Sequence, residues 1–130
     1  MNIIFLDING VLNTTTDYDF NPNCLVNLKQ LVKDTNAKIV ITSAWRRYEE
    51  SLNEIIKTLK TYDIEVNGTT KILHTTRSHE INVYLEEHEI EKFVILDDMI
   101  IEGFPNNLVH VDKTIGLSEE DILEAKKILQ

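Results

Sequence analysis

Near its N-terminus the chain reads Ile3-Ile4-Phe5-Leu6-Asp7-Ile8-Asn9-Gly10: four apolar residues, then a carboxylate, then a glycine. Four consecutive apolar residues predict a short strand that is buried on both faces, as strands of parallel sheets are. Gly10 lets the backbone turn soon after the strand ends. Because ligands of open α/β sheets bind at the carboxyl ends of strands, Asp7 is a candidate reactive residue.

Similar apolar runs recur along the chain and alternate with segments of helical periodicity. Strands are predicted over Ile3–Leu6, Ile39–Ile41, Phe93–Leu96 and Leu108–Val111, with a weaker one over Ile64–Val66 before an expected turn at Asn67-Gly68. The helical segments carry apolar residues at Leu25, Leu28 and Val32, at Tyr48, Leu52, Ile55, Ile56 and Leu59, at Ile81, Tyr84 and Leu85, and at Ile122, Ala125 and Leu129. We expect the first helix to begin at Pro22 and the last at a capping box over residues 118–121. This alternation predicts one α/β domain over residues 1–130, with a parallel sheet of about five strands covered on both faces.

The composition excludes several classes of protein. No apolar run is long enough to span a bilayer and no leader precedes the first strand, so we expect a cytoplasmic protein without a membrane partner. The net charge of −9 argues against a general nucleic-acid binder, which needs a basic patch. Cys24 is the single cysteine, which excludes an internal disulfide, and its apolar neighbours predict a buried thiol. The four glycines form neither a Walker A loop nor a dinucleotide fingerprint.

Polar residues follow three of the predicted strands, and these strand ends meet at one edge of a parallel sheet. Asp7 follows the predicted strand Ile3–Leu6, and Thr42-Ser43 follows Ile39–Ile41. Asp97-Asp98 follows Phe93–Leu96. Three carboxylates brought together repel one another unless a cation is present. Mg²⁺ suits such an oxygen-only site better than zinc, which prefers nitrogen and sulfur ligands.

The second strand end is suited to an anion. The hydroxyls of Thr42 and Ser43, with the free N–H groups of the following helix, predict a phosphate site. A basic side chain is then needed to neutralise a phosphoryl group, and Arg77 is our first choice with Lys71 second. Arg46 is an equally good candidate for a substrate contact or for a salt bridge to helix acids.

Taken together and in this order, four motifs resemble those of the haloacid dehalogenase-like (HAD) phosphatase superfamily over essentially the whole chain. They stand here as Asp7-Ile8-Asn9-Gly10-Val11-Leu12, Lys38-Ile39-Val40-Ile41-Thr42, Arg77-Ser78-His79-Glu80-Ile81 and Val94-Ile95-Leu96-Asp97-Asp98. Two segments are similar to a small capless subgroup, the phosphatase domains of RNA-repair proteins: Thr42-Ser43-Ala44-Trp45-Arg46 and Arg77-x-x-Glu80-Ile81-x-x-Tyr84-Leu85. The resemblance implies a three-layer α/β/α Rossmann-like fold without a separate cap domain.

The resemblance also implies a role for each matching residue. Asp7 would attack phosphorus and form an aspartyl-phosphate, Thr42 would bind a phosphoryl oxygen, and Arg77 would steady the phosphoryl group. Mg²⁺ would be held by Asp7, Asp97, Asp98 and the backbone carbonyl of Asn9. The substrate would be a phosphomonoester, with an open site favouring a nucleotide or polynucleotide terminus.

Asn9 departs from the motif, because its position belongs to the carboxyl that serves as general acid and base. An amide cannot transfer the proton, and such a loss typically costs about 10²–10⁴ in rate. Two explanations stay open: an Asp→Asn change engineered to trap a ligand, which we favour because every other motif is intact, or a protein that is naturally slow. The rival function is a catalytically silent phosphate-binding or signalling module of the same fold.

Overall fold

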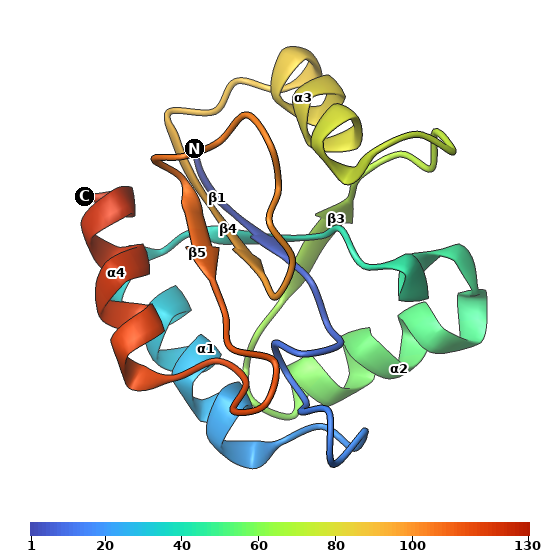
Figure 1. Ribbon diagram of the computed structural model, residues 1–130, viewed down its shortest axis with the longest axis vertical. Coiled ribbons are helices and arrows are strands. Elements are labelled where there is room, and N and C mark those ends of the chain that lie inside the picture. The colour runs from blue at the N-terminus through green and yellow to red at the C-terminus, as the bar shows by residue number, and fades with distance from the viewer.

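The computed structural model describes residues 1–130 and contains a five-stranded parallel sheet with four α-helices and one short 3₁₀ helix (Figure 1). The elements are β1 (Asn2–Leu6), α1 (Pro22–Thr35), β2 (Lys38–Ile41), η1 (Ala44–Arg47), α2 (Glu49–Lys60), β3 (Val66–Thr69), α3 (Arg77–Glu87), β4 (Lys92–Asp97), β5 (Leu108–His110) and α4 (Glu119–Leu129). The strand order is β3-β2-β1-β4-β5, which places the first strand at the centre of the sheet. The predicted α/β class and strand number are confirmed.

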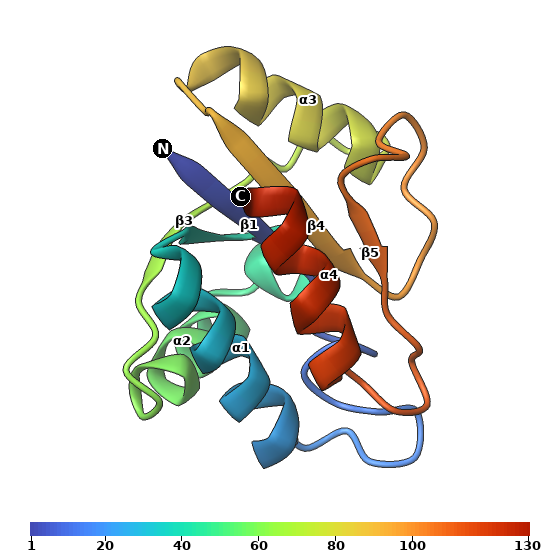
Figure 2. The same cartoon turned by 90° about the vertical axis from the view of Figure 1, so that its left-hand side faces the viewer.

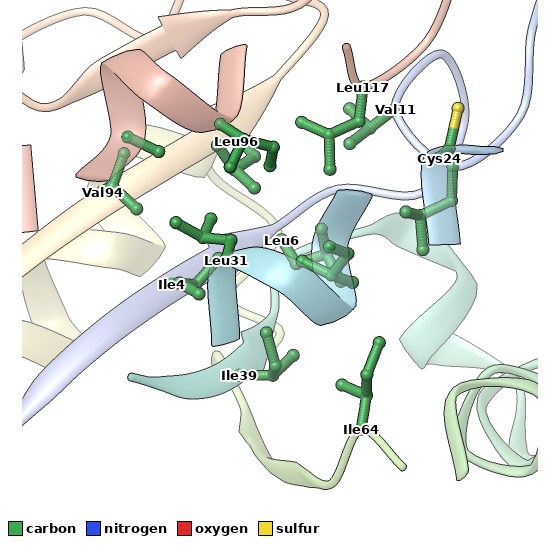
Figure 3. Close-up of a cluster of buried hydrophobic side chains, with 14 of the residues drawn as sticks. Ile4, Leu6, Val11, Cys24, Leu31, Ile39, Ile64, Val94, Leu96 and Leu117 are labelled. Carbon is green, nitrogen blue, oxygen red and sulfur yellow. The ribbon is translucent and has the colours of Figure 1, made fainter. Parts of the chain in front are cut away.

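Helices cover both faces of the sheet but unequally. In Figure 2, α3 lies alone on one side, while α1, α2 and α4 lie on the other. Side chains alternate along β1, so Ile4 and Leu6 join a cluster of 23 buried residues beneath α1, α2 and α4 (Figure 3). Ile3 and Phe5 face the other way and join a cluster of seven residues under α3. The result is a three-layer α/β/α fold without a cap, as predicted.

The helix boundaries follow the predicted caps. The Asn21 side chain accepts hydrogen bonds from the first turn of α1, and Pro22 occupies the start of that helix. The capping box before α4 is present, with Ser118 and Asp121 each bonding the backbone of the other. None of the helices combines the length and the apolarity needed to cross a membrane.

The third strand differs from its prediction. β3 covers Val66–Thr69, so Asn67 and Gly68 lie within the strand and the expected turn at these two residues is wrong. The Asn67 side chain accepts a hydrogen bond from the backbone N–H of Ile39, where the register between β2 and β3 is irregular. An edge strand tolerates such residues because only one of its sides must be paired.

We expect Leu31→Ala to lower the free energy of unfolding by about 2–5 kcal/mol, because it leaves a cavity in the larger cluster. Leu31 comes from α1, is fully buried, and points among Ile4, Ile39 and Val94 in Figure 3. Urea unfolding would measure the change. Leu123→Ala is the matched control on the exposed side of α4 and should shift the free energy by less than about 0.5 kcal/mol.

Candidate active site

The sheet register brings three of the predicted residues side by side. The paired residues Ile41, Leu6 and Leu96 end the aligned parts of β2, β1 and β4, so Thr42, Asp7 and Asp97 follow in one row. Backbone hydrogen bonds from Thr42 to Leu6 and from Asp7 to Leu96 continue the ladders. Because side chains alternate, this row faces the side of the sheet that α3 covers.

Three carboxylates meet at this edge. Oxygens of Asp7, Asp97 and Asp98 lie within 4.8 Å of one another. Asp98 packs against Gly10, whose φ of +81° is costly for other residues and where a Cβ would lie 2.7 Å from the Asp98 carboxylate. Three carboxylates with no nitrogen or sulfur donor among them form a set of ligands that could bind a metal, and they fit a hard cation such as Mg²⁺.

One cationic side chain from the protein reaches the carboxylates. Arg77 begins α3, and its Nη1 lies 2.8 Å from Asp97 Oδ2 and 3.4 Å from Asp7 Oδ2. Its other N–H groups have no acceptor within the protein. A single guanidinium therefore partly balances three carboxylates and keeps donors free for another anion.

Burial and the neighbouring charges shift the pKa values of these groups. Burial, followed by repulsion from Asp97, raises the pKa of Asp7 to about 8 despite the opposing effect of Arg77. Burial also raises the pKa of Asp97. Burial lowers the pKa of Arg77, but attraction to Asp7 and Asp97 outweighs it and raises the value overall. Without a cation, the site therefore holds protons that a carboxylate in water would release.

The strand end after β2 supplies hydroxyl groups in two different states. The Thr42 hydroxyl is fully buried and has no hydrogen-bond partner in the protein. Such a group costs about 1–3 kcal/mol unless a partner is supplied. The Ser43 hydroxyl accepts a hydrogen bond from the N–H of Trp45 and thereby caps η1. Of these two hydroxyls only that of Thr42 lacks a partner; the buried hydroxyl of Thr70, after β3, also has none.

Arg46 lies in the interior rather than at the surface, and its side chain is 2% exposed. All five N–H groups of its guanidinium donate to protein oxygens: the carbonyls of Thr42, Ser43, Thr70 and Lys71, and the carboxylate of Glu80. Burial lowers the pKa of Arg46, while Glu80 partly opposes that shift. Of the two predicted alternatives, the ion pair is therefore observed, and no donor is left for a substrate.

Lys71 is not brought to the carboxylates. Its ammonium group pairs with Glu87 near the end of α3, whereas Arg77 lies at the start of that helix. Glu87 lies ten positions after Arg77, which corresponds to about 15 Å along the helix axis. Between the two predicted basic residues, the structure thus places Arg77 at the site.

The exposed Asn9 side chain is held by a residue that sequence reasoning missed. Asn13 is 1% exposed, and its Nδ2 donates to Asn9 Oδ1 at 3.1 Å and to the carbonyl of Tyr18. Its Oδ1 accepts from the N–H of Gly10 at 2.8 Å. Asn13 therefore ties the loop before α1 to Asn9 and to the turn at Gly10.

Two further residues at the site were not predicted. Glu80 is part of the matching motifs but no role was predicted for it, and in the structure it is buried and pairs with Arg46. His110 is exposed, and its Nε2 donates to the carbonyl of Asp98 at 2.8 Å. The sequence pattern does not link Arg46 with Glu80, which lie 34 residues apart, or Asp98 with His110, which lie 12 residues apart.

We expect Mg²⁺ affinity to rise between about pH 6 and about pH 8, because the proton held by Asp7 competes with the metal. Stability without metal should change in the opposite sense. The folded-state pKa of Asp7 exceeds that of the unfolded chain, so the free energy of unfolding falls as the pH rises from about 4 to about 8. Calorimetric Mg²⁺ titrations and urea unfolding at several pH values would measure both trends. Asp7→Asn should flatten them, and unchanged slopes in that variant would assign them to other groups.

The sequence of the chain matches a known protein family. No curated protein and no solved structure matches the chain significantly. The family described as the HAD domain in Swiss Army Knife RNA repair proteins matches residues 3–122, and the chain belongs to this family.

Proposed function

We propose that the chain is a Mg²⁺-dependent phosphomonoesterase in which Asp7 is the nucleophile. The observation that carries the proposal is the meeting, at one sheet edge, of Asp7 with two more carboxylates, a guanidinium with free donors and a buried hydroxyl without a partner. Carboxylates would hold the metal, and the two donor groups would hold the phosphoryl oxygens. Membership of the HAD family supports this assignment.

Substrate binding would engage groups that the protein leaves unsatisfied. The hydroxyl of Thr42 would donate to one phosphoryl oxygen, which removes the cost of its buried, unpaired state. Arg77 would donate to another through the N–H groups that have no protein acceptor. Asp7 follows β1 beside the end of β2 that carries Thr42, and its carboxylate lies 3.4 Å from Arg77, so it would then face the phosphorus atom.

The proposed reaction proceeds in two displacements. The ionised Asp7 carboxylate attacks phosphorus, a new O–P bond forms, and the bond to the leaving oxygen breaks. Water then attacks the phosphorus of the aspartyl-phosphate and releases inorganic phosphate and free Asp7. Mg²⁺ bound by Asp7, Asp97, Asp98 and the Asn9 carbonyl would supply positive charge against the transferring phosphoryl group.

Asn9 would limit the rate of this reaction. The leaving oxygen needs a proton and the attacking water must lose one, and an amide side chain performs neither transfer. Asn13 donates a hydrogen bond to Asn9 Oδ1, which a carboxylate oxygen at the same place could equally accept. The surroundings of residue 9 are therefore compatible with an aspartate.

The proposed substrate is a phosphate at the end of a nucleotide or polynucleotide. No cap covers the site, and a surface hollow of about 530 Å³ borders Asp98 and includes Met99, His110 and Lys113. An open edge admits a bulky leaving group, and the family's description supports RNA ends. The net charge of −9 favours recognition of a terminus over tight binding along a polymer.

Asn9 also favours a second candidate function, a phosphate-binding module without turnover. In that case the same residues would bind Mg²⁺ and a phosphoryl group, and the missing acid would leave the bound group unreacted. The two functions differ only in whether phosphate is released.

We expect Asn9→Asp to raise the rate of phosphate release by about 10²–10⁴, because it restores proton transfer at the leaving oxygen. The assay would use an aryl phosphate and oligonucleotides phosphorylated at the 3′ or the 5′ end, with Mg²⁺. The aryl phosphate should respond less than the oligonucleotides, since its leaving group needs less protonation.

Two results decide between the candidate functions. Asp7→Asn added to the Asn9→Asp variant should abolish release, which would tie the activity to Asp7. If neither the native chain nor Asn9→Asp releases phosphate, while both bind Mg²⁺ and inorganic phosphate in calorimetric titrations, the binding module is the correct function.

A further inference from the structure

Arg46 connects the two parts of the chain that carry the proposed phosphate donors. Its Nη1 donates to the carbonyls of Thr42 and Ser43 at 2.8 and 2.9 Å. Its Nη2 lies 2.8 Å from the Glu80 carboxylate, which belongs to α3 one turn after Arg77. One guanidinium therefore bonds both the strand end of Thr42 and the helix of Arg77.

The pair also fixes the connection between β3 and α3. Arg46 donates to the carbonyls of Thr70 and Lys71, which follow β3. The second oxygen of Glu80 accepts from the N–H of Leu73 at 2.9 Å. The start of α3 is thus held by polar bonds to two strand ends, in addition to the small apolar cluster beneath it.

Stability alone is a weak reason for such a pair. The side chains of Arg46 and Glu80 are 2% and 5% exposed, and removing two charges from water is costly even when they are paired. Apolar side chains of similar size often serve a fold as well. Apolar side chains could not, however, form hydrogen bonds that hold the carbonyls after β2, the carbonyls after β3 and the start of α3 together.

We propose that Arg46 and Glu80 are positioning residues that set the separation between the Thr42 hydroxyl and the Arg77 guanidinium. The inference rests on the proposed function, because it assumes that these two groups bind one phosphoryl group. Precise placement matters since a displacement of about 1 Å at a reacting group can cost about 10² in rate. Neither positioning residue touches the substrate.

A double-mutant cycle on phosphate binding tests the proposal. Inorganic phosphate would be titrated calorimetrically at saturating Mg²⁺ into the native chain, Arg77→Ala, Glu80→Gln and the double variant. Arg77→Ala should weaken binding by about 10–100-fold, as expected for a lost hydrogen bond to a charged group. Glu80→Gln should weaken it about tenfold, and the double variant should be no weaker than Arg77→Ala alone.

Glu80→Gln should leave Mg²⁺ affinity within about twofold of the native value, because the carboxylates lie at the ends of β1 and β4. Glu87→Gln is the matched control, since Glu87 is also a paired carboxylate on α3 but lies at the far end of the helix. It should change neither affinity. Arg46→Lys, which keeps the charge but loses the planar set of donors, should weaken phosphate binding as Glu80→Gln does.

Different results would overturn different claims. If Arg77→Ala leaves phosphate binding unchanged, the proposed function fails and this inference fails with it. Two other results would reject only the positioning role, provided that Arg77→Ala weakens phosphate binding. In the first, the double variant binds phosphate more weakly than Arg77→Ala by the full factor seen for Glu80→Gln alone. In the second, Glu80→Gln leaves phosphate binding unchanged. Loss of folding in both Glu80→Gln and Arg46→Lys would also reject that role, because the pair would then serve the fold itself.

Discussion

Repulsion among three carboxylates is the constraint around which the site is built. Asp7 and Asp97 are adjacent because β1 and β4 pair and end together, and Gly10 leaves room for Asp98 beside them. The folded chain can hold them only with bound protons, with a counter-charge or with a cation. Arg77 supplies part of the counter-charge, while burial raises the pKa of Asp97 and burial together with repulsion from Asp97 raises the pKa of Asp7.

Most of the fold was predictable because the buried strands are apolar on both faces and the helices carry recognisable caps. Pro22 and the capping box at Ser118 marked two helix starts correctly. The edge strand β3 was misplaced, because Asn67-Gly68 is a strong local turn signal. Its pairing with β2 outweighs that signal, and pairing between distant segments cannot be read from local pattern.

The site divides in the same way. Residues at strand ends were predictable in position, since parallel strands align their carboxyl ends whatever the loops do; these are Asp7, Thr42, Asp97 and Asp98. The basic residues were less certain, because their placement depends on tertiary contacts. The sequence favoured Arg77 over Lys71, and the structure places Arg77 beside the carboxylates while Lys71 pairs with Glu87. The interior position of Arg46 depends on acceptors up to 34 residues away.

The unequal covering of the sheet has a consequence for how the protein fails on heating. Its larger cluster of 23 buried residues holds three helices together, whereas α3 rests on seven buried residues and a few polar bonds. Elements with few buried apolar contacts open first, in local transitions that leave the remaining structure intact. Opening of α3 would carry Arg77 away while the sheet and the carboxylates stay in place. Loss of the Arg77 contacts on heating would then precede the melting of the whole chain.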